Sequence, residues 1–81
     1  MDTRIALVGI MLEDMSNAPA VNQILHDFSE YVVARMGVPC REKGLSVISL
    51  VVDAPQDVIN HLSGKLGQLA GVNAKTIYSK V

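Results

Sequence analysis

Two runs of mainly apolar residues dominate the chain. They cover Ile5 to Leu12 and Leu45 to Val52, and both are rich in β-branched side chains. Apolar residues at both parities are typical of strands that are buried on both faces. Tyr31 to Val38 and Val72 to Tyr78 mix apolar residues with small and polar ones. We therefore expect two central strands and two edge strands, and Pro39 favours the end of an edge strand.

The segment after the first apolar run has a helical period. Its apolar residues fall at i, i+3, i+4 and i+7, in the stripe Val21, Ile24, Leu25 and Phe28. That spacing places one apolar stripe on an amphipathic helix. Ser16 and Asn17 offer capping side chains at its start, and Pro19 fits its first turn.

A second helix is predicted after the second apolar run. It opens near Pro55 and Asp57 and ends at Gly67 or Gly71. Its inward stripe is Val58, Ile59, Leu62 and Leu66. The polar turn between the second and third strands covers residues 41–44, and its last residue, Gly44, is available for a positive φ angle.

The elements follow the order βαββαβ, which predicts a single α+β domain over residues 1–81. With the apolar strands in the centre, the fold is ferredoxin-like, a four-stranded antiparallel sheet of order 4-1-3-2 with two helices on one face. The first strand is apolar toward both faces, with Ile5 and Leu7 on one side and Ala6 and Val8 on the other. The face without helices then presents about 400 Å² of apolar surface. We expect a homo-oligomer, a dimer or a tetramer, built through this face or through a sheet edge.

Composition excludes several classes of function. Aromatic residues make up 4% of the chain and Trp is absent, which leaves little surface for stacking bases. The formal net charge of −1 gives no general attraction to phosphate backbones, so no direct nucleic-acid partner is expected. The single cysteine, Cys40, excludes an internal disulfide and suits a reducing compartment. The longest apolar run is too short to cross a bilayer, and we expect a cytoplasmic protein with no membrane partner.

Potential catalytic and metal-binding motifs are incomplete. His26-Asp27 resembles the metal-binding pair of one phosphohydrolase family, but His61 is the only further histidine. The Gly64–Gly67 segment lacks the spacing of a phosphate-binding loop. Cys40 lies beside cationic residues, but nothing in the sequence supplies a base for it. We therefore expect no enzyme activity, no cofactor and no metal.

Arg35 is the most unusual charged residue, because it interrupts an otherwise apolar strand. It binds a ligand, pairs with an acid across an interface, or faces solvent at a sheet edge. The acidic pair Glu13-Asp14 ends the first strand, which the third strand separates from the second. A contact of Arg35 with that pair is therefore expected to cross between subunits rather than to form within one.

The segment Arg35 to Pro39, continued by Arg41 to Leu50, resembles the regulators proposed for the iron-only hydrogenase system. The resemblance runs nearly end to end and includes the first strand, Val52-Asp53 and the glycines from residue 64 to residue 71. Cys40 departs from it where an aromatic residue is common. The resemblance implies a stand-alone ACT-like domain of ferredoxin type.

The same family is distantly similar to the C-terminal domain of nickel-responsive repressors. Here the corresponding strand carries Arg35 and Met36 in place of the His-x-His pair, so the nickel site is not implied. Because the first apolar run begins close to Met1, we expect no DNA-binding arm before it. The resemblance implies a regulatory module that senses a small effector through oligomer contacts, with a possible protein partner. ACT-like domains bind effectors near the first strand-to-helix loop, which selects Glu13, Asp14, Asn17 and Arg35. An accessory protein for hydrogenase maturation, with no small ligand, is the alternative. A small ferredoxin-fold enzyme would need a deep polar pocket that this composition hardly furnishes.

Overall fold

The computed structural model describes residues 2–80 and has the predicted order of elements. The strands and helices are β1 (Arg4–Leu12), α1 (Ala18–Asp27), β2 (Val32–Cys40), β3 (Leu45–Ala54), α2 (Gln56–Gly67) and β4 (Val72–Tyr78). Short 3-10 turns precede α1, join it to β2 and form the tip of the β2–β3 hairpin: η1 (Met15–Asn17), η2 (Ser29–Tyr31) and η3 (Arg41–Lys43). All strand pairs are antiparallel and the sheet order is β2-β3-β1-β4, which confirms the ferredoxin-like prediction.

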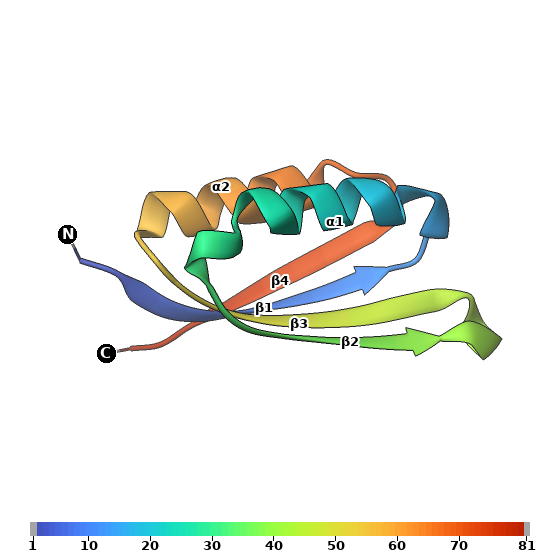
Figure 1. Cartoon of the computed structure of the whole chain (residues 1–81), viewed down its shortest axis with the longest axis horizontal. Helices are drawn as coiled ribbons and strands as arrows, with labels where there is room; N and C mark the ends of the chain where they lie inside the picture. The colour runs from blue at the N-terminus through green and yellow to red at the C-terminus, as the bar shows by residue number, and fades with distance from the viewer. Residues whose placement is uncertain (1, 81) are drawn as a thin grey trace.

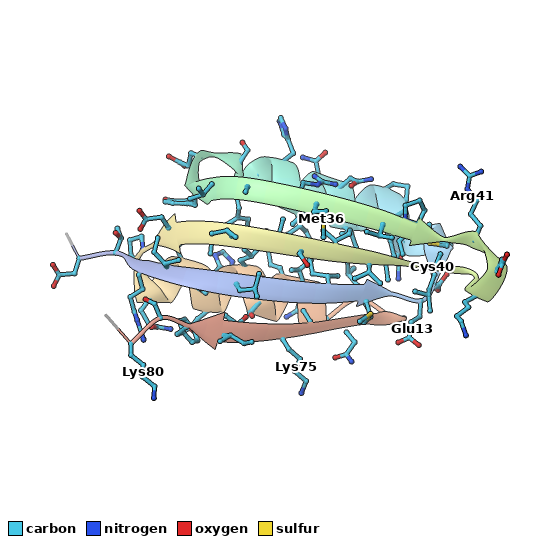
Figure 2. The ribbon with its side chains drawn as sticks, turned by 90° about the horizontal axis from the view of Figure 1, so that it is seen from below. Glu13, Met36, Cys40, Arg41, Lys75 and Lys80 are labelled. Carbon is cyan, nitrogen blue, oxygen red and sulfur yellow. The ribbon has the colours of Figure 1, made fainter. Side chains whose placement is uncertain are left out.

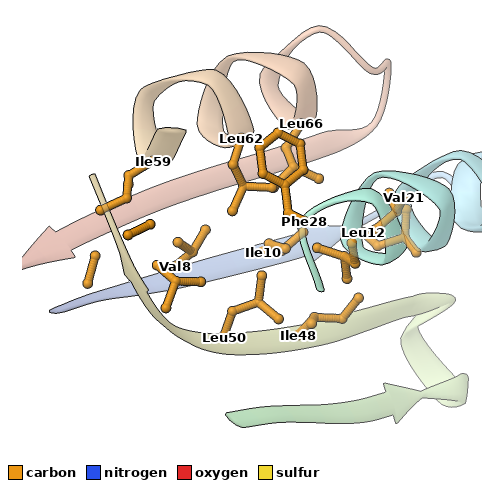
Figure 3. Close-up of a cluster of buried hydrophobic side chains, with 14 residues drawn as sticks. Val8, Ile10, Leu12, Val21, Phe28, Ile48, Leu50, Ile59, Leu62 and Leu66 are labelled. Atoms are coloured by element: carbon orange, nitrogen blue, oxygen red, sulfur yellow. The ribbon is translucent and has the colours of Figure 1, made fainter. Parts of the chain in front are cut away.

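Both helices lie on the same face of the sheet (Figure 1). The alternation along β1 and β3 shows how the core is filled, because every second residue of each strand points toward the helices. Val8, Ile10 and Leu50 are fully buried there, whereas Leu7 on the other face is 41% exposed. The helices contribute Val21 and Leu25 from α1 and the residues Ile59, Leu62 and Leu66 from α2 (Figure 3). The apolar stripes predicted for the helices therefore face the sheet.

The start of α1 differs from the expected capping. Asn17 occupies the N-cap position but makes no side-chain cap bond. Its amide instead donates to the carbonyl oxygen of Ala70 at 2.5 Å, in the loop that connects α2 to β4. The predicted proline does lie in the first turn of the helix. Asn17 forms this long-range hydrogen bond because the α2–β4 loop passes beside this end of the sheet.

The glycines at the predicted turns have different roles. Gly44 closes the β2–β3 hairpin with φ 68°, as expected. The second helix ends at Gly67, so Gly71 is not its terminator. Gly71 turns into β4 with φ 70°, and a Cβ there would overlap Asp14. Only glycine fits at Gly71, because both the backbone angle and the space exclude a side chain.

The second strand is displaced from its expected bounds. Tyr31 lies in η2 rather than in the strand, and the pairing with β3 continues to Cys40, opposite Leu45. Pro39 therefore sits within the strand, opposite Ser46, rather than ending it. A proline is tolerated there because β2 is an edge strand.

A bulge near the start of β2 sets which way its side chains point. Val32 pairs with Val52 and Ala34 pairs with Val51, so that Val33 is an extra residue in the strand. An inserted residue reverses the facing of every later position. Arg35 consequently pairs with Leu50 and shares its face, the face that carries the helices.

Candidate functional site

The face of the sheet opposite the helices is apolar over most of its width (Figure 2). One row across the sheet joins Ala34, Val51, Leu7 and Ile77, and another joins Val38, Val47, Met11 and Asn73. Six large apolar side chains of this face are between 41% and 68% exposed: Ile5, Leu7, Met11, Met36, Val38 and Ile77. We call this surface the open face.

The middle row of the open face is less bulky and partly polar. It joins Met36 on β2, Ser49 on β3, Gly9 on β1 and Lys75 on β4. A Cβ at Gly9 would have only the Lys75 carbonyl oxygen nearby, at 4.0 Å. Packing within the chain therefore does not require a glycine at this position. Because Gly9 has no side chain, the surface at the centre of the open face is recessed. Lys75 extends from the β4 edge (Figure 2).

The predicted loop residues Glu13, Asp14 and Asn17 lie together beyond the end of β1. The backbone N–H groups of Glu13 and Asp14 both donate to the Gly71 carbonyl oxygen, at 2.7 Å and 3.2 Å. Oδ1 of Asp14 accepts from the hydroxyl of Ser16 at 2.6 Å and from its backbone N–H at 3.0 Å. These bonds favour the ionised carboxylate and lower the pKa of Asp14. The polar groups of this loop thus fasten η1 to the α2–β4 loop.

Arg35 lies apart from those three residues. It is level with Val8, the partner of Leu50, whereas Asp14 follows the end of β1. Arg35 and Asp14 are thus separated by six residues along the strand direction and by two strand spacings across the sheet. This places them on the order of 20 Å apart. Within the chain, a guanidinium N–H of Arg35 donates to Oδ1 of Asn22 on α1 at 3.0 Å. The expected contact between subunits stays a prediction.

Arg35 and Asn22 border a groove between α1 and β2, with a volume of about 430 Å³. We call it the α1–β2 groove. It is lined by Asn22, Leu25, His26, Ser29, Val32, Arg35 and Leu50. Asn22, His26 and Ser29 were not connected with Arg35 in the sequence analysis. Their spacing of i, i+4 and i+7 is a polar flank beside the apolar stripe of α1, and this was the available signal.

His61 and Cys40, the other candidate residues from the sequence, are not among the residues that line the α1–β2 groove. His61 is exposed, and its ring meets that of Phe28 edge-on, with centroids 5.7 Å apart. Cys40 is half-buried at the end of β2, and its Sγ lies 3.9 Å from the carbonyl oxygen of Val38. Within residues 2–80, no three His, Cys, Asp or Glu side chains are grouped so that they could hold a metal ion.

The topology and the open face define the class of this molecule, a small ferredoxin-like α+β domain with one uncovered sheet face. Residues 4–76 match the TM1266-like family model, described as a proposed regulator of the iron-only hydrogenase system. The chain belongs to this family. No curated protein matches it.

A solved structure agrees with this assignment. The uncharacterized protein TM1266 from Thermotoga maritima is 42% identical to this chain, with a TM-score of 0.93. The match covers 98% of this chain and 100% of the Thermotoga chain. In the part of the chain that the structure describes, no helix has the length and apolar character needed to cross a membrane.

Proposed function

We propose that this protein is an oligomeric, effector-sensing regulatory module of the iron-only hydrogenase system. It acts in the cytoplasm through protein contacts, without catalysis and without binding DNA by itself. The observation that carries the proposal is the open face, where six large apolar side chains are at least 41% exposed. An apolar patch of this kind on a small domain is typical of an interaction surface.

The size of the open face limits how it can be used. About 400 Å² on each of two copies gives about 800 Å² in total, and stable specific interfaces bury about 1,200–2,000 Å². A pair formed through the open face alone is therefore concentration-dependent. A tight assembly would add the β2 edge, whose residues are exposed from Val33 to Pro39. The same surface is large enough for transient contact with another protein of the hydrogenase system.

Two neighbouring residues of β3 test the role of the open face. Val47 lies on it between Val38 and Met11, whereas Ile48 is 7% exposed on the helix side. Val47→Asp should keep the fold and shift sedimentation toward the monomer, because the charge must be desolvated when a partner covers the face. Ile48→Asp should unfold the domain, because its carboxylate would enter the core.

Sedimentation equilibrium over a range of protein concentrations, with circular dichroism for the fold, is the measurement. A wild-type protein that stays monomeric at every concentration contradicts the oligomer. Equal assembly of Val47→Asp and the wild type contradicts the open face as its interface.

Effector binding at the first strand-to-helix loop has less support from the contacts there. Asp14 is engaged by Ser16, and Asn17 is engaged by Ala70. These groups hold the loop in place, and a ligand would have to displace them. Arg35, by contrast, lines the α1–β2 groove.

A further inference from the structure

We infer that the α1–β2 groove binds a small organic carboxylate that carries a short branched apolar tail. The inference names the ligand class for the effector-sensing part of the proposed function. Binding itself involves one subunit and does not depend on assembly. The groove volume of about 430 Å³ falls within the range of small-molecule sites, about 300–1,000 Å³.

The bulge in β2 is what turns Arg35 toward this groove. In an unbroken strand, Val32 opposite Val52 would place Arg35 opposite Ser49, on the open face with Lys75. With Val33 inserted, Arg35 lies opposite Leu50 and faces α1. The bulge also places Met36 and Val38 on the open face. Bulges commonly re-aim a side chain next to a functional site.

Among residues 2–80, no acidic side chain forms an ion pair with the Arg35 guanidinium at the groove. Within residues 2–80, its hydrogen-bond partner is the neutral amide of Asn22. Arginine has five N–H donors, so about four remain for solvent or a ligand. None of the lining residues is acidic. A carboxylate fits this arrangement, because a guanidinium can donate two parallel hydrogen bonds to its oxygens.

The rest of the lining selects the body of the ligand. The amide of Asn22 on α1 and the hydroxyl of Ser29 on η2 add hydrogen-bonding groups. Leu25, Val32 and Leu50 supply apolar side chains, and two of them are buried. A bare inorganic anion would leave this apolar part of the groove unused. An apolar tail would cover it and gain from leaving water.

Isovalerate, its uncharged analogue isovaleramide and inorganic phosphate are the probes for this site. Each is titrated into ¹⁵N-labelled protein at constant ionic strength and pH, and amide and side-chain chemical shifts are followed. Isovalerate should give saturable shifts centred on Arg35, Asn22 and Ser29. Isovaleramide should bind at least tenfold more weakly, because it lacks the charge that pairs with the guanidinium.

Matched variants separate the groove from general charge effects. Arg35→Gln should weaken isovalerate binding at least tenfold while keeping the folded spectrum. Arg41→Gln removes the same charge from the exposed hairpin tip, away from the α1–β2 groove, and should leave the affinity unchanged. Arg35→Lys should bind with intermediate affinity, because an ammonium retains the charge but loses the fork of donors.

Three outcomes overturn the inference. The first is that isovalerate shows no saturable binding to the wild type. The second is that isovaleramide binds with the same affinity as isovalerate. The third is that Arg35→Gln and Arg41→Gln lose the same amount of isovalerate affinity. Phosphate binding as strong as isovalerate binding overturns the assignment of an apolar tail. Sedimentation of the same samples reports assembly separately. A monomer that binds isovalerate contradicts only the proposed oligomer. An oligomer that does not bind isovalerate contradicts only the proposed ligand site.

Discussion

The two edges of the sheet are covered very differently, although each belongs to a strand–helix–strand half of the same order. Along β4, half-buried and exposed residues alternate, whereas β2 is exposed from Val33 to Pro39. The β4 edge is tied to α2 by Ser63 with Thr76 at 2.9 Å and by Asn60 with Tyr78 at 3.1 Å. The corresponding α1–β2 side has the bond from Arg35 to Asn22.

The difference follows from the side chains that each edge strand turns toward the helices. β4 presents Val72, Ala74, Thr76 and Tyr78, three of which pack against the core. After its bulge, β2 presents Arg35, Gly37 and Pro39. A charged residue, a glycine and a proline give a helix little to bury against. The α1 side therefore remains an open groove, whereas the α2 side is closed.

Truncating one buried leucine under each helix should give the largest contrast between the two sides. Leu66 on α2 is 0% exposed and Leu25 on α1 is 3% exposed, but Leu25 also lines the α1–β2 groove. Leu66→Ala should cost about 3–5 kcal/mol of unfolding free energy, because it leaves a closed cavity. Leu25→Ala should cost about 2–3 kcal/mol, because the open side can relax or admit water. Urea unfolding at equal protein concentration measures both, and equal losses would contradict a more open α1 side.

The two glycines with positive φ give the next largest contrast. A Cβ added at Gly71 would overlap the Cβ of Asp14, whereas a Cβ at Gly44 would meet nothing within 4 Å. Gly44→Ala should lose about 1–2 kcal/mol, the cost of a left-handed alanine. Gly71→Ala should lose more than that, because the new Cβ also forces the α2–β4 loop away from η1. Thermal unfolding compares them, and equal shifts in Tm would show that the contact with Asp14 is not tight.

The smallest effect is expected from the pH dependence of the Asp14 contact. Its pKa is lowered in the folded chain by the Ser16 hydroxyl and then by the Ser16 backbone N–H, from an ordinary value of 3.8. A carboxyl with a depressed folded pKa contributes stability above its ordinary pKa and loses it as the pH falls through the folded value. Ser16→Ala should raise the pKa of Asp14 toward 3.8 and reduce this acid-side loss. Carboxyl ¹³C titration measures the pKa directly, and an unchanged value in the variant would remove Ser16 as the cause.

The sequence by itself was sufficient for the order of elements, the sheet order and the two faces of β1. Apolar residues at both parities in Ile5 to Leu12 could only belong to a central strand, and Val72 to Tyr78 has the bounds found for β4. These features depend on local periodicity and on how many faces a strand must bury. Both are properties of a short stretch of chain, so the pattern alone was informative.

The tertiary structure decided where the functional side chains meet. The bulge at Val33 has no distinct local signature, yet it turns Arg35 from the open face toward α1. Likewise, the Asn17 side chain bonds to the Ala70 carbonyl oxygen instead of capping α1. Gly71 cannot be replaced because a Cβ there would overlap Asp14. Each depends on a partner distant in sequence. The local pattern specifies which residues a strand or helix contains. Strand register and loop packing specify which of those residues face one another. For this reason the α1–β2 groove could not be predicted from the sequence.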